Sequence, residues 1–243
     1  MIPRFHCPFS LSPGALVELP AGAAHHAVKV LRLREGDALT LFDGQGGEWR
    51  ATLKVGAGRT AHAALGDFVS RDVESPLAVT LVQALPAGDK MDWVVEKCVE
   101  LGVAAIQPVV AGRSIVRLSA ERMARRVIHW NAIAAAACAQ SGRNRVPPVA
   151  APLDLSQYLA AAMAHNALRL VLAPEGDARV RDLPRPGLPV TVMVGAEGGW
   201  EDEELRAARA AGFQALRLGP RVLRTETAGA AALAALQAMW GDF

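Results

Sequence analysis

The stretch from Val194 to Glu204 (VGAEGGWEDEE) combines three glycines with five carboxylates. Glycine lets the backbone approach a ligand closely or adopt a positive φ, so this composition is typical of a loop that holds a small molecule. Five negative charges would repel a polyphosphate but would accept a cationic or neutral ligand. Among cofactors, the sulfonium of S-adenosylmethionine fits that sign, as does a nucleoside held by backbone groups. A structural alternative is that Glu201, Asp202 and Glu203 stabilise the N-terminus of a following helix.

A second candidate stretch runs from Leu216 to Gly229 (LRLGPRVLRTETAG). Its Gly-Pro pair is expected to end a strand. Thr225 or Thr227 would cap the last helix, and Glu226 near the start of that helix would favour its dipole. Arg224 has no such capping use, which makes it the residue of this stretch with the strongest claim to chemistry.

A third feature is a concentration of arginine. Between Arg113 and Arg145 the chain has seven arginines and one acid, Glu121. Arginine suits the recognition of phosphates and bases, and Arg143 and Arg145 flank Asn144 in a stretch suited to phosphate and base-edge contacts. The alternative is a solvated helix face; the cluster as a whole favours nucleic acid.

The arginines are expected to share one face of a long helix that begins after Ser119, its predicted cap. At 100° per residue the helix has two stripes, one to pack and one to face outward. The packing stripe consists of Met123, Val127, Trp130 and Ala134, and the outward stripe of Arg122, Arg125, Arg126 and His129.

The elements that must position these residues change character near residue 72. Residues 1–72 are predicted to form short strands with glycine-rich turns, at 15–19, 37–42, 48–54 and 60–65, as in a small β-barrel of the kind that carries RNA-binding modules. The polar segment 71–76 ends in proline and is interpreted as a linker.

From residue 77 strands and helices alternate, which predicts a mostly parallel sheet with helices on both faces. Ligands of such sheets bind beyond the carboxyl ends of the strands, where this sequence places its glycine and proline loops. The predicted strands are 78–85, 104–110, 168–173, 190–195 and 215–219; the predicted helices are 89–101, a long one from 119, 154–166, 202–211 and 227–240.

Several other classes of protein lose support. The sequence contains no GxGxxG, GxxxxGK[ST] or HExxH, and Gly112–Val116 lacks the second glycine of a nucleophile elbow. Three distant cysteines form neither a disulfide framework nor a metal-binding CxxC pair, so no metal is expected. With no signal-peptide pattern and no apolar run of about 18 residues, we expect a cytoplasmic protein with no membrane segment.

Together these stretches resemble the ribosomal RNA small subunit methyltransferase E (RsmE-type) family of the SPOUT superfamily. The resemblance covers nearly the whole chain, and its last motif is long enough to be specific. It rests on GRNRVP (142–147), GAEGG (195–199), LGPRVLRTETA (218–228), PRF (3–5), HAVKVLRLREG (26–36), KMD (90–92) and ELGV (100–103).

The resemblance implies a fold and an activity that the residue patterns alone do not show. The expected fold is α/β, with a PUA-like RNA-binding β-barrel at 1–72 and a SPOUT domain at 73–243 whose chain end forms a trefoil knot. The implied reaction is transfer of one methyl group from S-adenosylmethionine to N3 of a uridine in the decoding region of 16S rRNA, within the 30S subunit. Members of the family are homodimers, with each active site completed at the subunit interface.

The resemblance also implies roles for particular residues. Arg224 would stabilise charge developing on the uracil, and Glu226 is a weaker candidate for the base. The expected cofactor-binding residues are Leu172, Ala173, Pro174, Val194, Gly195, Glu197, Gly198, Gly199, Leu216, Leu218, Gly219, Leu223, Arg224 and Thr225. The expected RNA-binding residues are Arg4, Arg32, Arg122, Arg125, Arg126, Arg143, Asn144 and Arg145.

Two departures from the family pattern and two alternative functions stay open. Ala196 stands where the family usually has proline, which would make the glycine loop less rigid. Ala139 stands where a glutamate is expected, so we assign that position no function. The alternatives are a SPOUT methyltransferase for another RNA, such as tRNA, and a non-catalytic RNA-binding or assembly factor that has kept the fold.

Overall fold

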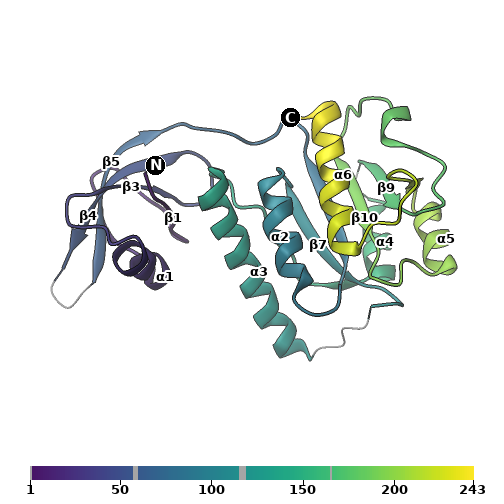
Figure 1. Ribbon diagram of the computed structural model, residues 1–243, viewed down its shortest axis with the longest axis horizontal. Helices are drawn as coiled ribbons and strands as arrows, with labels where there is room; N and C mark the ends of the chain where they lie inside the picture. Colours follow the sequence, from purple (N-terminus) through teal and green to yellow (C-terminus); the bar gives the residue numbers. More distant parts are fainter. Residues whose placement is uncertain (1, 57–59, 115–118, 165) are drawn as a thin grey trace. The chain divides into compact units, whose positions relative to one another are not determined.

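The computed structural model describes residues 2–56, 60–114, 119–164 and 166–243. The chain divides into two compact units (Figure 1). Unit 1 consists of residues 1–74 and 135–146, and unit 2 of residues 75–134 and 147–243. The main boundary falls inside the predicted linker. The prediction of a single division at residue 72 missed that the chain returns to unit 1 for residues 135–146.

Unit 1 is built on a five-stranded sheet with the order β1-β3-β4-β5-β2. The sheet is curled, as in a half-barrel, and β1 pairs with β3 in parallel while the other pairs are antiparallel. Apolar residues alternate with polar ones along β4 and β5, so one face of the sheet is buried. The strands are β1 (Arg4–His6), β2 (Leu16–Glu18), β3 (Ala38–Phe42), β4 (Glu48–Val55) and β5 (Ala61–Val69).

The sequence analysis missed two elements of unit 1. Strand β1 is only three residues long, too short for a recognisable period, and it pairs with the last three residues of β3. The segment after β2 folds as a short α-helix, α1 (Ala21–His25), which continues as a π-helical turn, η1 (His26–Val30). Ala23, Ala27 and Val28 of this segment pack against the core of the sheet.

Unit 2 contains a six-stranded parallel sheet with the order β11-β9-β10-β6-β7-β8. Its inner strands read as continuous apolar runs, such as VTVMV in β10, because both faces of a parallel sheet are covered. The strands are β6 (Val79–Ala84), β7 (Ala105–Val110), β8 (Leu153–Asp154), β9 (Leu168–Leu172), β10 (Val190–Val194) and β11 (Gln214–Leu216).

Helices lie on both faces of this sheet, as predicted. Helices α2 and α6 pack on each other over β6 and β10, and α4 and α5 pack on each other on the opposite side, where α4 contacts β7 (Figure 1). The elements are α2 (Lys90–Glu100), α3 (Ala120–Ser141), α4 (Leu155–Ala162), a 3₁₀ turn η3 (Val180–Asp182), α5 (Asp202–Ala210) and α6 (Thr225–Trp240).

The helix ends differ in how their backbone groups are capped. Gly102 follows α2 with φ +82°, in the left-handed region that glycine tolerates. Ser119 Oγ accepts the backbone N–H of Arg122 at 3.4 Å, as expected for the cap of α3. Asp89 directly precedes α2, but its side chain makes no capping hydrogen bond. In the described part of the chain, no helix is long and apolar enough to cross a membrane.

The fold class is therefore the predicted one, an α/β protein with a small curled sheet and a larger parallel sheet. The trefoil knot that the resemblance implies stays a prediction. It concerns the loops after β9, β10 and β11, which also form the site.

Candidate active site

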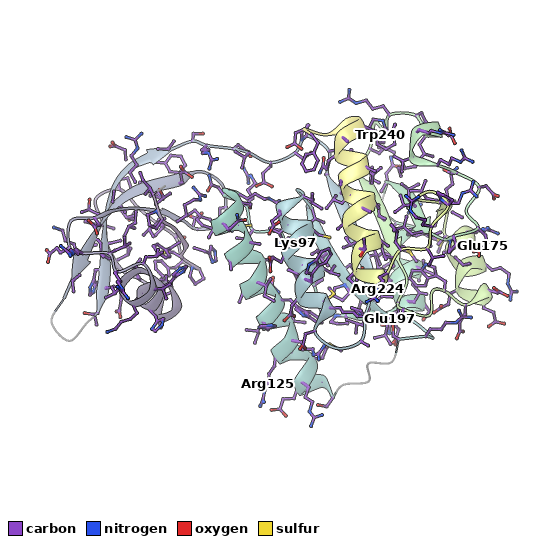
Figure 2. The ribbon with its side chains drawn as sticks, in the orientation of Figure 1. Lys97, Arg125, Glu175, Glu197, Arg224 and Trp240 are labelled. Carbon is purple, nitrogen blue, oxygen red and sulfur yellow. The ribbon has the colours of Figure 1, made fainter. Side chains whose placement is uncertain are left out.

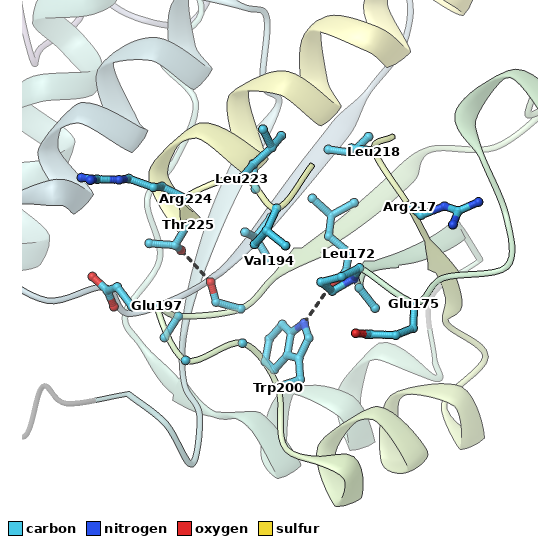
Figure 3. Close-up of a pocket in the computed structure, with 18 of the residues that line it drawn as sticks. Leu172, Glu175, Val194, Glu197, Trp200, Arg217, Leu218, Leu223, Arg224 and Thr225 are labelled. Atoms are coloured by element: carbon cyan, nitrogen blue, oxygen red, sulfur yellow. Dashed lines mark hydrogen bonds between the residues drawn. The ribbon is translucent and has the colours of Figure 1, made fainter. Parts of the chain in front are cut away.

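A cavity of about 720 Å³ lies at the carboxyl ends of β9, β10 and β11 (Figure 3). Its walls are the loops that follow these three strands, together with the start of α6. This is the edge of a parallel sheet where ligands bind, and its volume is in the range of small-molecule and cofactor sites. The glycine and proline loops that the sequence singles out as the site therefore line one cavity.

All the residues predicted to bind the cofactor line this one cavity. They come from three segments far apart in the chain and meet because their strands are neighbours in the sheet. The shared set is Leu172, Ala173, Pro174, Val194, Gly195, Glu197, Gly198, Gly199, Leu216, Leu218, Gly219, Leu223, Arg224 and Thr225. Sequence reasoning missed Lys90, Arg113, Trp200 and Asp202, which also line it.

Thr225 connects the start of α6 to the glycine loop. Its hydroxyl donates a hydrogen bond of 2.6 Å to the Gly195 carbonyl (Figure 3). The same hydroxyl accepts a hydrogen bond of 2.9 Å from the Gln83 side chain. The predicted capping role of Thr225 is wrong, because it is the first residue of α6 and the N-cap position belongs to Arg224. Thr225 is instead a buried tether between two walls of the cavity.

Further hydrogen bonds hold the other walls. The Trp200 indole N–H donates to the Leu172 carbonyl at 3.2 Å, and the Ala173 N–H donates to the Leu216 carbonyl at 3.1 Å (Figure 3). Gly199 has φ +69°, and its N–H closes a turn on the Ala196 carbonyl at 2.9 Å. The turn forms with alanine in place of the family's usual proline.

A side chain at Gly195 would crowd the backbone of the glycine loop. A Cβ at this position would lie 3.1 Å and 3.2 Å from two backbone atoms of Gly199. A Cβ on Gly198 would instead meet the side chain of Arg113, which is flexible. The Gly195 position is therefore the one where a side chain would displace the loop itself.

The charge of the cavity differs from the prediction. Only Glu197 and Asp202 of the five carboxylates in the acidic stretch line the cavity. Glu204 accepts the N–H groups of Glu201 and Gly112 at 2.8 Å and 2.7 Å, as part of the start of α5. Five cations also line the cavity: Lys90, Arg113, Arg217, Arg221 and Arg224. The site is therefore of mixed charge, and the argument from an anionic loop does not carry over to the folded protein.

Lys90, the first residue of α2, joins two acids beside the cavity. Its Nζ donates to Glu197 Oε1 at 2.7 Å and lies 3.8 Å from Glu226 Oε2. Burial would raise the pKa of Glu197, but hydrogen bonds from Lys90 and from backbone N–H groups outweigh it and lower the pKa. Glu226 Oε2 is buried and has no hydrogen-bond partner among the described residues, and the Lys90 ammonium brings a positive charge close to it.

Arg224 and Glu226 occupy different environments. Arg224 is exposed and lines the cavity, on the same side as Glu197 and away from Arg217 and Glu175 (Figure 3). Glu226 is not among the lining residues; its carboxylate faces Lys90. Of these two residues, Arg224 is therefore the one that forms part of the cavity wall.

The predicted outward stripe of α3 is largely exposed. Arg122 and Arg125 are exposed, and Arg125 forms an exposed ion pair with Glu121 one turn earlier (Figure 2). Arg126 reaches the Gly88 carbonyl at 3.4 Å, and His129 pairs with Asp92 of α2 at 2.9 Å. Trp130 and Ala134 of the packing stripe are buried. Arg117 lies outside the described residues.

Three other predicted RNA-binding residues, Arg4, Arg143 and Asn144, bind partners within unit 1. Arg143 and Asn144 are 5% and 2% exposed. Arg143 pairs with Glu74, while Arg4 hydrogen-bonds to Glu48 and Asn144 and stacks over a phenylalanine ring. The expectation that Arg4, Arg143 and Asn144 contact RNA is thus not supported by their placement, because their polar groups face partners within the protein.

Arg145 and Arg32 are more accessible. Arg145 donates to the Gln45 carbonyl at 2.8 Å, yet its side chain is 57% exposed. Arg32 is exposed and has φ 55°, the left-handed region, directly after the π-helical turn. Both remain available to a ligand of unit 1.

The Glu48 network predicts acid-sensitive stability. Burial would raise the pKa of Glu48, but hydrogen bonds from Arg4 and Asn144 and the charges of Arg4 and Arg71 lower it. The stabilisation is therefore complete above the carboxyl's ordinary range near 4.5 and is lost as the pH falls through the lowered pKa. We expect Glu48→Gln to reduce the free energy of unfolding by about 1–3 kcal/mol at pH 7, because the neutral amide offers the donors of Arg4 and Asn144 one acceptor oxygen instead of two charged ones.

Urea unfolding at pH 7 and at pH 3 measures this effect. The loss caused by Glu48→Gln should shrink at the lower pH, because the stabilisation by the wild-type carboxylate is lost as the pH falls through its lowered pKa. Glu35→Gln is the control, because Glu35 forms only an exposed pair with Lys54 at 3.9 Å. An equal loss at both pH values would contradict the assigned network.

The described residues offer neither a metal site nor a reactive cysteine. They contain no cluster of three or more His, Cys, Asp or Glu able to hold a metal. Burial raises the pKa of the Cys98 thiol to about 12, and those of Cys7 and Cys138 to about 11. These cysteines are therefore protonated thiols at neutral pH and are poor nucleophiles.

Comparison with known sequences supports this organisation. Residues 73–237 match the RNA methyltransferase domain family, and residues 19–64 match the RNA methyltransferase PUA domain family. The chain is 38% identical over 229 residues to the ribosomal RNA small subunit methyltransferase E of Synechocystis sp., covering 93% of this chain and 74% of the relative. It is 31% identical over 222 residues to the enzyme of the same name from Bacillus subtilis, covering 87% and 86%.

Solved structures show the same fold. A ribosomal RNA small subunit methyltransferase E from Neisseria gonorrhoeae, bound to S-adenosyl methionine, has a TM-score of 0.91 and 42% identity, with full coverage of both chains. A methyltransferase from Legionella pneumophila, solved with its cofactor SAM, has a TM-score of 0.94 and 39% identity, again with full coverage. Both similarities span the two units and the cavity-forming loops.

Proposed function

Because the chain belongs to the ribosomal RNA small subunit methyltransferase E family, we propose that it methylates N3 of a uridine in the decoding region of 16S rRNA, with S-adenosylmethionine as donor. One observation carries the proposal. Three sequence-distant loops that match the family's motifs form a single cavity of cofactor size.

The residues of the cavity fit this cofactor. Backbone groups of the glycine loop and of the loops after β9 and β11 are available to the adenine and ribose, and apolar side chains such as Leu172, Val194 and Leu223 line the walls. Acidic Glu197 and Asp202 suit a sulfonium and an amino group, while nearby arginines suit a carboxylate. A zwitterionic ligand with one cationic centre matches a cavity of mixed charge.

The protein's own contribution to the reaction is positioning and electrostatics. S-adenosylmethionine supplies an already activated methyl group when it is bound. N3 of uracil becomes a good nucleophile only as it loses its proton, and negative charge then spreads to the neighbouring oxygens. Arg224, exposed at the cavity wall, is assigned to stabilise that charge.

Glu226 stays a weaker candidate for proton acceptor. Its buried Oε2 atom faces Lys90, and it does not line the cavity. A positioning role through Lys90, which in turn holds Glu197, accounts for the same contacts. The pH profile of Glu226→Gln separates the two roles. If Glu226 is the base, the variant loses the rise of turnover with increasing pH that deprotonation of the carboxyl causes. If Glu226 only positions Lys90, turnover falls by the same factor at every pH.

Arg122, Arg125 and Arg126 on α3 are proposed to contact RNA phosphates. The triple variant R122Q/R125Q/R126Q is expected to reduce the slope of log affinity against log salt by about 2, at roughly 0.7 per phosphate on single-stranded RNA. Filter binding of 16S rRNA over a range of salt concentrations measures it. R206Q/R209Q on α5 is the matched control, and a slope equal to that of wild type would contradict the proposed surface.

The remaining parts of the proposal come from the family. A homodimer that completes each active site, action on the 30S subunit, a knotted cofactor loop and a cytoplasmic location are proposed on that basis. Sedimentation of the purified protein tests the dimer.

The experiment for the function is methyl transfer to separated RNAs. Protein and methyl-labelled cofactor are incubated with 30S subunits, free 16S rRNA or tRNA, each from cells that lack this modification. The proposal predicts label in 16S rRNA, and mass analysis of nucleosides should identify N3-methyluridine. Label only in tRNA would favour a SPOUT enzyme of different target, and cofactor binding with no transfer to any RNA would favour the assembly factor.

A further inference from the structure

A second groove, of about 820 Å³, lies beside the cofactor cavity in unit 2. Four arginines line it, from the 3₁₀ segment after β9 and from the loop after β11: Arg179, Arg181, Arg217 and Arg221. Among the residues that the structure describes, no carboxylate lines the groove, and its other lining residues are apolar or are glycine and proline. None of these arginines belongs to the surface on α3.

The backbone brings the two arginine-bearing segments together. The Arg217 N–H donates to the Ala178 carbonyl at 2.9 Å, and the Ala178 N–H donates to the Ala215 carbonyl at 3.2 Å. A backbone bridge also pairs Ala178 with Leu216. Arg179 is therefore the residue next to Ala178, whose backbone is hydrogen-bonded to the segment that carries Arg217. These backbone hydrogen bonds hold the two arginine-bearing segments side by side.

Little negative charge within the protein balances these groups. Arg181 lies 3.6 Å from Asp182, an exposed pair at 71% and 58% side-chain exposure, which contributes little. Arg179 and Arg221 are exposed. Four like charges around one groove repel one another, so the arrangement favours binding of an anion that bridges several guanidinium groups.

The groove is continuous with the cofactor cavity. Arg217, Leu218, Gly219, Arg221 and Leu223 line both of them. A polyanion in the groove would therefore reach the edge of the site where the methyl group is transferred. Its open apolar floor, which includes Leu218 and Leu223, suits a chain of nucleotides better than an isolated small anion.

We propose that this four-arginine groove binds the RNA backbone next to the target nucleotide. The inference rests on the proposed function, which supplies RNA as substrate, and it adds a second phosphate-binding surface to that on α3. Arg179 and Arg181 line the groove alone, whereas Arg217 and Arg221 also line the cofactor cavity. The first pair therefore isolates RNA binding from cofactor binding.

The test compares R179Q/R181Q with wild type and with R206Q/R209Q, which removes two exposed arginines from α5. Filter binding of 16S rRNA is measured against salt, and calorimetry with S-adenosylmethionine alone reports on folding and on the cavity. We expect R179Q/R181Q to weaken RNA binding roughly tenfold at physiological salt and to lower the salt slope by about 1.4. Cofactor affinity should be unchanged, and R179K/R181K should restore the slope.

Three outcomes would overturn the inference. The first is that R179Q/R181Q has the same RNA affinity and salt slope as R206Q/R209Q. The second is that the wild-type protein has no affinity for RNA. The third is that R179Q/R181Q changes oligomeric state, which would make the groove a contact for a second copy of the chain. Methyl transfer by wild type is assayed in parallel. Transfer by wild type together with unaltered RNA binding by R179Q/R181Q would reject the groove alone and leave the proposed function standing.

Discussion

Replacing Arg224 with alanine should lower the turnover number by about a hundred- to a thousandfold, the effect of removing one group that stabilises developing negative charge. Arg224 lines the cavity on the wall that carries Glu197 (Figure 3), and its side chain makes no capping hydrogen bond in the helix it precedes. Single-turnover methyl transfer to 30S subunits measures the chemical step. Cofactor affinity, measured by calorimetry, should change much less than turnover.

Arg224→Lys separates charge from geometry. Lysine keeps the positive charge but loses the planar fork of donors, so it should retain part of the activity. Arg206→Ala on α5 is the control for loss of an exposed arginine. Full turnover by Arg224→Ala with normal cofactor and RNA binding would remove Arg224 from the mechanism.

Replacing Gly195 with valine should abolish measurable cofactor binding. Even a Cβ would lie 3.1 Å from a backbone atom of Gly199, and the added methyl groups of valine deepen the clash. The Gly195 carbonyl also accepts the Thr225 hydroxyl, so displacement of the loop disturbs the start of α6.

A matched glycine controls for the general cost of valine. Gly187 lies in a loop, and a Cβ there would meet nothing within 4 Å. Gly187→Val should bind the cofactor as wild type does, and its melting temperature should rise with added cofactor by the same amount. Equal cofactor affinity in Gly195→Val and Gly187→Val would show that the glycine loop does not hold the ligand.

Most of unit 2 could be predicted from the sequence because its signals are local and strong. Buried parallel strands read as apolar runs, and Gly102 and Ser119 mark helix ends. The site followed from a general rule, since the loops after neighbouring parallel strands converge at one edge of the sheet. Lys90 was missed as a site residue because its contacts lie more than 100 positions away in the chain.

Charge was the least reliable guide. The acidic stretch indicated an anionic site, but Glu204 closes on backbone N–H groups, and arginines from other segments enter the cavity. Arg143 and Asn144 looked like RNA-binding residues because arginine and asparagine suit RNA. In the structure Arg143 is buried against Glu74 and Asn144 against Glu48, so both have partners within the protein. These partners are distant in the sequence, and no local pattern indicates them.

The division into units was predicted only in part for the same reason. Segment 135–146 belongs to unit 1 because Arg143 and Asn144 pair with residues of the first strands and of the linker. No local signal distinguishes this end of α3 from its beginning. Strand β1, at three residues, was likewise too short to predict.

Calorimetric titration of the purified protein with S-adenosylmethionine is the most direct test of the central claim, that the three loops after β9, β10 and β11 form the cofactor site. The account predicts saturable binding of one cofactor per chain, lost in Gly195→Val and kept in Gly187→Val. No binding by the wild-type protein, with or without RNA present, would contradict it and leave an RNA-binding protein on a methyltransferase scaffold.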